Sequence, residues 1–376
     1  MGCGGAERVM ASLANAWAER GHQVTVVALN GEPSFYQLSP SIEYRALAVA
    51  RPSYNLAERF LNNIRRIRQL RRTVRDIRPE VIVSFLDATN VVTLLTTVGL
   101  HVPVIVCEHN DPSQRNCGLM WGVLRVITYP FATAVTLLTQ GSLDNMRWLV
   151  GNRGTVMPNP VRLPDHDDCE PIAATGTRRI IAMGRLNAIK GFDYLLDAFR
   201  QVAVKHPDWA LTILGEGLLR PQLEQQIERL GLSGRVDLHG RVTDPFRWLR
   251  SADLYVMSSR YEGFPCALCE AMACGLPAIS FDCPSGPRAI IRDGVDGVLV
   301  PPRDVDALAR AMDTLMSDAA ERRRLAARAP EVLQRFSLEK VLRLWDELFD
   351  NIGVQSETTH QVQRPRKVSV RLGPST

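Results

Sequence analysis

The sequence lacks any hydrophobic run of the roughly 20 residues that a membrane-spanning helix needs. The best candidate, residues 91–107, is interrupted by threonines, a glycine, a histidine and a proline. The first residues also lack the apolar core of a signal peptide, because Glu7 and Arg8 stand where that core would be. We therefore expect a cytoplasmic protein with no export signal.

Lysine is absent from residues 1–160, which hold 16 arginines against 11 acidic residues. Eight of these arginines lie between Arg59 and Arg78, where Asp76 is the single acidic residue. Apolar residues recur in the same segment at steps of three and four, which predicts an amphipathic helix with a basic outer face. That face is either an ordinary solvated surface or a surface that attracts anionic lipid head groups or a phosphate-bearing acceptor. Aromatic residues make up only 6% of the chain, which argues against a nucleic-acid partner.

The chain has eight cysteines, but none of them shows the spacing of a metal site. Cys266, Cys269 and Cys274 fall inside one predicted helix, with no second cysteine pair and no histidine at zinc-finger spacing. We expect reduced, structural thiols and no metal.

Short β-rich runs alternate with amphipathic helices along the chain, which predicts an α/β protein with parallel sheets. The simplest architecture is two Rossmann-like domains with a cleft between them, at residues 1–160 and 161–350, joined by a linker at 158–176. The last helix is expected to be able to pack back on the first domain, and residues 351–376 are expected to form a disordered tail. The predicted strands are 22–29, 80–86, 103–108, 134–138, 179–183, 210–214, 236–238, 254–258, 278–281 and 298–300. The predicted helices include 6–20, 57–78, 192–206, 219–230, 305–316 and 338–349.

In such sheets ligands bind beyond the carboxyl ends of the strands, next to the N-termini of helices. Two turns at such places carry cations or glycines. The run Gly4-Gly5-Ala6-Glu7-Arg8 opens a helix, where glycines let the backbone approach a phosphate. Arg185 and Lys190 follow an apolar strand five residues apart. They either bind a diphosphate together or are two solvated surface cations.

Two further turns carry acids and a histidine. Glu262 precedes a predicted helix that begins near Pro265 and contains Glu270, so the two carboxylates lie on the order of 10 Å apart. They are too far apart to share a proton, but one ligand can span both; alternatively, they are a helix-dipole carboxylate and a surface charge. His109 follows the strand at 103–108 and either bonds a sugar hydroxyl or phosphate or is a structural histidine.

The ordered motifs GGAER, GRLNAIKG, YEGFPCALCE and CPSGPRAII resemble those of family 4 of the retaining nucleotide-sugar glycosyltransferases. The resemblance covers roughly residues 2–350. It implies the GT-B fold and transfer of a hexose or N-acetylhexosamine from a nucleotide diphosphate sugar, with UDP favoured, without a metal or cofactor. The Cys283–Arg288 run and the Glu-His-Asn turn most resemble bacterial members that act on lipid-linked oligosaccharides or surface polysaccharides.

The resemblance also implies a role for each site residue. Arg185 and Lys190 would bind the donor diphosphate and stabilise the leaving group, and Glu262 would contact the donor sugar. His109 would lie over that sugar from the other domain. The remaining donor-binding residues would be Glu270, at the ribose hydroxyls, Gly5, at the diphosphate, and Gly263, Phe264 and Cys266, through their main-chain N–H groups.

One feature departs from the family pattern. Members begin with an apolar strand at the centre of the first sheet, whereas Gly2 here follows Met1 directly. We expect either a truncated start or a first domain that lacks its central strand and is poorly stable. A catalytically weak nucleotide-sugar-binding protein of the same fold is therefore the main alternative. A nicotinamide-dependent oxidoreductase is disfavoured, because no strand feeds a G-x-G-x-x-G turn followed by an acidic residue about 20 positions on.

Overall fold

The structure is a computed structural model that describes residues 5–49, 56–109, 119–161, 163, 176–354 and 367–372. The chain divides into two compact units, which are described separately. Unit 1 comprises residues 1–159 and 341–376, and unit 2 comprises residues 160–340. Most of the predicted linker at 158–176 lies outside the described residues.

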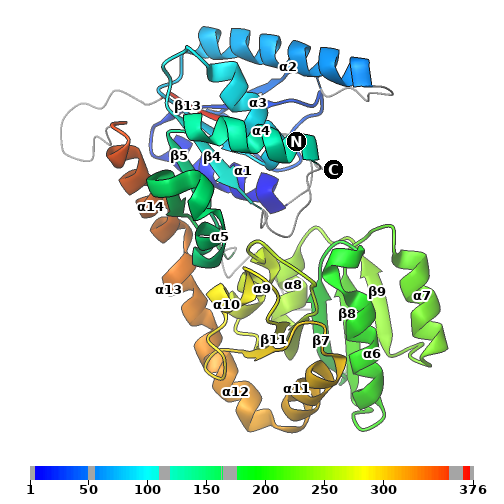
Figure 1. The fold of residues 1–376 in the computed structure, drawn as a ribbon. Coiled ribbons are helices and arrows are strands. Elements are labelled where there is room, and N and C mark those ends of the chain that lie inside the picture. The colour runs from blue at the N-terminus through cyan, green and yellow to red at the C-terminus, as the bar shows by residue number, and fades with distance from the viewer. Residues whose placement is uncertain are drawn as a thin grey trace. The chain divides into compact units, whose positions relative to one another are not determined.

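Unit 1 is a parallel sheet of seven strands in the order β2-β1-β13-β3-β4-β5-β6 (Figure 1). The strands are β1 (Gln23–Ala28), β2 (Glu43–Ala46), β3 (Val81–Phe85), β4 (Val104–Glu108), β5 (Ala134–Leu137), β6 (Gly154–Val156) and β13 (Lys367–Leu372). The helices are α1 (Gly5–Glu19), α2 (Leu56–Ile77), α3 (Asp87–Thr97), α4 (Leu119–Thr128), α5 (Gln140–Val150) and α14 (Leu338–Asn351). Helices α2, α3 and α4 pack side by side in that order.

The central strands of unit 1 are buried on both faces, as expected for a parallel sheet covered by helices. Leu70 and Val74 of α2 are buried at the sheet, which confirms the predicted apolar stripe for the part of the helix whose side chains are described. Phe60, another apolar residue of the predicted helix, lies outside that part. Helix α14 packs on α1, with the rings of Trp345 and Trp17 edge to face at 5.4 Å.

Strand β13 corrects two expectations about unit 1. The tail was predicted to be disordered, but residues 367–372 form a strand between β1 and β3. The rest of that tail from residue 355 onward lies outside the described residues. Of the two alternatives for the first domain, a truncated start or a missing central strand, the second is wrong, because β13 occupies the centre of the sheet. The pattern of the sequence did not reveal this strand because strand pairing joins segments that are remote in sequence.

Unit 2 is a six-stranded parallel sheet in the order β12-β11-β10-β7-β8-β9. Its strands are β7 (Arg178–Met183), β8 (Trp209–Leu214), β9 (Val236–Gly240), β10 (Leu254–Met257), β11 (Ala278–Phe281) and β12 (Val298–Val300). Its helices include α6 (Phe192–Ala203), α7 (Arg220–Arg229), α8 (Pro245–Arg250), α9 (Cys266–Ala273), α10 (Pro287–Ile290), α11 (Val305–Ser317), α12 (Ala319–Arg328) and α13 (Val332–Phe336).

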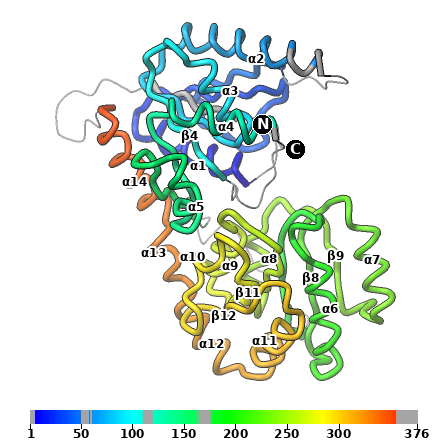
Figure 2. The backbone as a smooth tube through the Cα atoms, in the orientation of Figure 1, coloured from blue at the N-terminus to red at the C-terminus, as the bar shows by residue number. Residues whose placement is uncertain are grey.

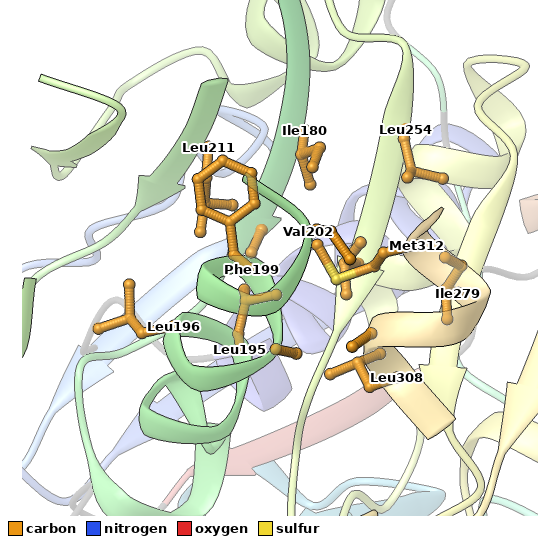
Figure 3. Close-up of a cluster of buried hydrophobic side chains, with 14 of the residues drawn as sticks. Ile180, Leu195, Leu196, Phe199, Val202, Leu211, Leu254, Ile279, Leu308 and Met312 are labelled. Atoms are coloured by element: carbon orange, nitrogen blue, oxygen red, sulfur yellow. The ribbon is translucent and has the colours of Figure 1, made fainter. Parts of the chain in front are cut away.

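Apolar side chains of α6 and α11 fill the core of unit 2 against its sheet (Figure 3). Phe199 of α6 lies beside Leu211 of β8, and Met312 of α11 lies toward Ile279 of β11. These contacts fix the central strands, so the turns that follow them have defined places. The tube view in Figure 2 shows the strands and helices of unit 2 succeeding one another along the chain.

The predicted strands are all present, with ends that shift by one or two residues. The sequence predicts no bounds for three strands and seven helices of the described residues, namely β2, β6, β13, α3, α4, α5, α8, α10, α12 and α13. Among the described residues, no helix is long and apolar enough to cross a membrane.

Candidate active site

The strand order of unit 2 reverses beside β7. From β7 the chain moves to β8 and β9 on one side, and then returns to β10 and β11 on the other. Such a switch point opens a crevice beyond the carboxyl ends of the two strands, where open α/β sheets bind their ligands. The turns after β7 and β10 are the ones that carry Lys190 and Glu262.

The turn after β7 is held tightly against the end of β10. Asn187 caps the turn by accepting a hydrogen bond from the Lys190 N–H at 3.3 Å. Gly191 has φ +59°, and a Cβ there would lie 2.1 Å from the Ser258 carbonyl oxygen, so the position requires glycine. The Ser258 hydroxyl in turn donates to the Lys190 carbonyl at 3.1 Å. The cationic residue is therefore presented by a rigid turn.

Lys190 and Glu262 meet directly at this switch point. The Lys190 Nζ lies 2.6 Å from the Glu262 Oε1, and the Ser259 hydroxyl donates to the same oxygen at 2.6 Å. The Lys190 stem crosses Gly184, where a Cβ would lie 3.0 Å from it. The Lys190 side chain is 26% exposed and that of Glu262 is 11% exposed, so the ammonium group is within reach of a ligand from solvent.

Arg185 lies on the same turn as Lys190 and is exposed. Within the part of the chain that the structure describes, no hydrogen bond or ion pair engages its guanidinium group. An uncommitted guanidinium beside an ammonium is suited to two or more anionic oxygens, because it can donate to two of them in parallel.

The second carboxylate, Glu270, lies inside α9 and is buried. Burial raises the pKa of the Tyr255 phenol well above its usual value, and the charges of Glu262 and Glu270 raise it further. Both carboxylates therefore lie near one tyrosine on β10. This places the two acids in one part of unit 2, at the end of β10 and in the helix that follows it.

The loop around residue 285 packs closely against Glu262. Glu262 and Ser285 form an isolated parallel bridge, and Ser285 has φ +77°. A Cβ on Gly286 would lie 2.7 Å from the Pro265 ring and 3.0 Å from the Glu262 Cβ. Strained and close-packed backbone of this kind recurs at functional sites, where the surrounding structure holds it in place.

Gly263, Phe264 and Cys266, which were predicted to contact the donor through their main-chain N–H groups, have different surroundings. The Phe264 side chain packs edge to face on Phe336 at 5.1 Å and is buried, so it serves the core of unit 2. The Cys266 thiol lies 3.7 Å from the Phe264 carbonyl at the start of α9. Gly263 lies between Glu262 and Phe264 in the same loop. Their contacts with a donor remain predictions.

Sequence reasoning missed two glycines at the end of β8. A Cβ on Gly215 would lie 1.9 Å from the Gly184 carbonyl oxygen, and one on Gly217 would lie 2.3 Å from the Leu186 carbonyl oxygen. Glu216, between them, pairs with Arg220 at 2.5 Å. The Gly-Glu-Gly run directly after an apolar strand was the available signal.

Unit 1 holds the other two predicted residues, His109 and Gly5. His109 follows β4, and its ring stacks on Phe85 at 4.9 Å. Burial lowers the pKa of His109 to about 4, so the imidazole is neutral at pH 7. Its Nδ1 is buried and has no hydrogen-bond partner among the described residues. Gly5 opens α1, and the space around it is open.

Next to His109 lies a buried polar network that the sequence did not reveal. The Tyr129 hydroxyl donates to the Glu108 Oε1, and the Asn90 amide donates to the Tyr129 hydroxyl at 3.3 Å. Arg125 lies 3.7 Å from Glu108 and 3.9 Å from Asp87. Burial raises the pKa of Glu108 to about 8, with a further contribution from the Asp87 charge. Glu108 is therefore mostly protonated at pH 7.

Comparisons with known proteins bear on both units. The model of Glycosyltransferase Family 4 matches residues 3–163, and the model of Glycosyl transferases group 1 matches residues 170–332. The chain belongs to glycosyltransferase family 4. It is thus a glycosyltransferase, and the expected two Rossmann-like domains with parallel sheets are confirmed.

Individual relatives extend this result. An alpha-1,4-N-acetyl-D-galactosaminyltransferase of Campylobacter jejuni, whose name specifies a PP-undecaprenol acceptor, is 27% identical over 93% of this chain and 96% of its own length. An exopolysaccharide phosphotransferase of Streptomyces coelicolor is 30% identical over 81% of this chain, which spans only 32% of that longer protein. HepE of Anabaena, solved with UDP and glucose, has a TM-score of 0.74 at 20% identity and covers 92% of this chain and 96% of its own. That likeness supports the GT-B fold of this family.

Proposed function

We propose that this glycosyltransferase moves a hexose or N-acetylhexosamine from a nucleotide diphosphate sugar to a glycan acceptor with retention of configuration. UDP is the favoured nucleotide of the donor. The observation that carries the proposal is the Lys190–Glu262 pair at the switch point of unit 2, beside the exposed Arg185. Two cations suit a diphosphate, and a carboxylate suits the hydroxyls of a sugar.

In the proposed reaction the bond between the anomeric carbon and the diphosphate oxygen breaks as the bond to the acceptor oxygen forms. Negative charge grows on the diphosphate, and Lys190 and Arg185 stabilise it more strongly than the ground state. The departing phosphate oxygen takes the proton of the acceptor hydroxyl, so no enzyme nucleophile and no metal are required. Lys190 exchanges its partner from Glu262 to the diphosphate when the donor binds.

We assign the remaining residues to the same reaction. Glu262, released from Lys190, contacts the donor sugar, and Glu270 binds the ribose hydroxyls, with main-chain groups near Gly263 and Cys266 facing the donor. His109 and Gly5 serve donor handling from unit 1. A neutral imidazole suits His109 for bonding a sugar hydroxyl, because it can donate from one nitrogen and accept at the other.

A donor screen tests this function. The purified protein is incubated with UDP-, GDP- and ADP-sugars and a polyprenyl-diphosphate-linked glycan, with EDTA present, and free nucleoside diphosphate and glycosylated product are measured. We expect one donor to be consumed, and NMR of the product to show the anomeric configuration of that donor. Binding of UDP without turnover of any donor would instead favour the alternative, a nucleotide-sugar-binding protein of the same fold.

We further propose that the acceptor is lipid-linked and that unit 1 contacts an anionic membrane surface through the Arg59–Arg78 helix. Four arginines of α2 are exposed, namely Arg65, Arg68, Arg72 and Arg75. Helix α3 lies between α2 and α4, and α4 with the turn after it exposes apolar side chains. These are Met120, Val123, Val126, Ile127 and Phe131. Basic and apolar groups together favour the surface of an anionic bilayer.

Vesicle co-sedimentation tests the membrane contact. We expect binding to phosphatidylglycerol vesicles, weak binding to phosphatidylcholine vesicles, and release at high salt. The double variant Arg68→Glu/Arg72→Glu should abolish vesicle binding. The matched control Arg200→Glu/Arg229→Glu, which changes two exposed arginines of unit 2, should reduce vesicle binding much less. Equal binding to both kinds of vesicle would contradict the contact.

A further inference from the structure

One arginine binds the loop after β10 to the turn after β7. Arg260 lies two residues before Glu262, and its main-chain N–H donates to the Ile189 carbonyl at 2.7 Å. Its guanidinium group also donates to the Ala188 carbonyl. Both carbonyls belong to the short turn Ala188–Lys190. Arg260 therefore binds the turn of Lys190 through both its main chain and its side chain.

The start of α6 holds the guanidinium group of Arg260 in one orientation. The group donates to both oxygens of the Asp193 carboxylate, at 3.0 and 2.6 Å, in the bidentate geometry of a strong arginine–carboxylate pair. It also lies over the ring of Tyr194, 4.2 Å from the ring centroid, and Tyr194 packs edge to face on Phe281 of β11. The Arg260 side chain is 22% exposed. A planar donor held by an acid, an aromatic ring and a carbonyl also fixes the groups that it binds.

Three consecutive residues of the loop after β10 connect the two partners of the candidate site. The Ser258 hydroxyl donates to the Lys190 carbonyl at 3.1 Å, and Arg260 binds the two preceding residues of the same turn. Ser259, between them, donates to the Glu262 Oε1 at 2.6 Å, and the Lys190 Nζ lies 2.6 Å from that oxygen. One short segment therefore fixes the main chain of Lys190 relative to the side chain of Glu262.

We propose that Arg260 is a positioning residue of the donor site. Its pair with Asp193 holds the turn of Lys190 against the loop of Glu262, and this sets the place of the Lys190 ammonium group. Arg260 acts through Lys190 and does not touch the reacting atoms. The inference rests on the proposed function, in which Lys190 must lie where charge grows on the diphosphate. A misplacement of about 1 Å in such a site can cost about 10²-fold in rate.

Turnover of a double variant tests this role. Arg260→Met keeps an unbranched side chain and removes the guanidinium group. We expect it to lower kcat about ten-fold or more. In a Lys190→Ala background the same change should lower kcat no further, because it acts through an ammonium group that is already absent. Additive losses would overturn the proposal, since a general structural role would lower kcat in both backgrounds.

Arg324 of α12 offers a matched control, because it makes a similar set of bonds. It donates to both oxygens of the Glu321 carboxylate, at 2.7 and 2.6 Å, and to the Gly294 carbonyl at 2.9 Å. Arg324→Met should leave kcat unchanged, and a loss as large as that of Arg260→Met would contradict the proposal. Arg260→Lys keeps the charge but cannot bind both carboxylate oxygens in one plane, so its kcat should lie between those of wild type and Arg260→Met.

An NMR measurement on lysine separates this proposal from the proposed function. The sequence has four lysines, so few signals appear when their side chains are dimethylated with ¹³C, and the Lys190 signal is the one lost in Lys190→Ala. Glu262→Gln gives the signal of Lys190 without its carboxylate partner. We expect Arg260→Met to move the Lys190 signal toward that position, and Arg324→Met to leave it in place.

The two possible failures give different results. A Lys190 signal that stays in place in both Arg260→Met and Arg260→Lys would overturn the positioning role, even if the wild type transfers a sugar. A signal that moves as expected, in a protein that turns over no donor, would support the positioning of Lys190 and contradict the proposed function instead.

Discussion

The two units build their parallel sheets from different parts of the chain. In unit 2 the sheet and its switch point are built from strands in one continuous stretch, and the turns after β7 and β10 follow their strands directly. In unit 1 the central position of the sheet is filled by β13, from the far end of the chain. Both sheets nevertheless have buried central strands and a carboxyl edge of the kind at which open α/β sheets bind ligands.

The polar groups at the two sheet edges also differ. The Lys190–Glu262 pair in unit 2 is partly exposed and rests on a rigid turn, so a ligand can displace one partner. The Glu108 network in unit 1 is buried and shielded from solvent, and Tyr129 and Arg125 hold it in place. The comparison teaches that exposure separates a pair suited to ligand exchange from a network suited to fixing local structure.

The largest expected effect tests the functional side of this comparison. Lys190→Ala should lower kcat by on the order of 10²–10³, because it removes a charge that stabilises the leaving diphosphate. The control Lys205→Ala removes an exposed lysine of the same unit that pairs with Asp313, and should leave kcat unchanged. Near-normal turnover of Lys190→Ala would remove this pair from the reaction.

The next effect tests how rigid the turn of unit 2 is. Gly191→Ala should lower the free energy of unfolding by about 3 kcal/mol or more, since its Cβ would collide with the Ser258 carbonyl in a left-handed conformation. Gly231→Ala, at φ +67° with open space around it, should cost about 1 kcal/mol. Denaturant titration measures both. Equal losses of unfolding free energy in the two variants would mean that the close approach of Gly191 to the Ser258 carbonyl adds no cost of its own.

A smaller effect is expected in unit 1. Tyr129→Phe removes the hydroxyl that donates to Glu108 and accepts from Asn90, and should cost about 1–3 kcal/mol of unfolding free energy. Donor turnover per folded molecule should stay near normal, in contrast to Lys190→Ala. A large loss of kcat in the folded variant would show that the network serves catalysis.

The smallest effect is a pH dependence of stability. Folded Glu108 keeps its proton up to a pKa of about 8, whereas the unfolded chain releases it near 4.5, so unfolding free energy falls as pH rises through this window. His109, with its pKa lowered to about 4, makes stability rise with pH up to about 6.5. The contribution of Glu108 is therefore clearest between pH 6.5 and 8.

Denaturant titration across that range compares wild type with Glu108→Gln, a neutral side chain of similar shape. We expect the fall in stability between pH 6.5 and 8 to be reduced in the variant. An unchanged slope would show that Glu108 is ionised throughout.

The strands of unit 2 could be predicted because each is a short apolar run that ends at a glycine, proline or polar turn. The contact between Lys190 and Glu262 was harder to predict from the sequence than these strands. Each residue could be assigned to a turn after a strand, but only the order of β7 and β10 in the sheet brings the two turns together.

Two features depend on contacts that local pattern does not encode. Residues 367–372 alternate apolar and polar side chains, as strands do, but they follow a polar segment, and only their pairing with β1 and β3 makes them a central strand. Glu108 was visible beside His109, but its partners Asp87, Arg125 and Tyr129 come from helices and a turn that the sequence did not predict.

Calorimetric titration with UDP and UMP tests the central claim, that the turns after β7 and β10 bind a nucleotide diphosphate. We predict that wild type binds UDP at least about ten-fold more tightly than UMP, because Arg185 and Lys190 contact the additional phosphate. In Lys190→Ala this preference should shrink toward one while the affinity for UMP stays unchanged. A wild type that binds both nucleotides equally, or a variant that keeps the full preference, would contradict the account.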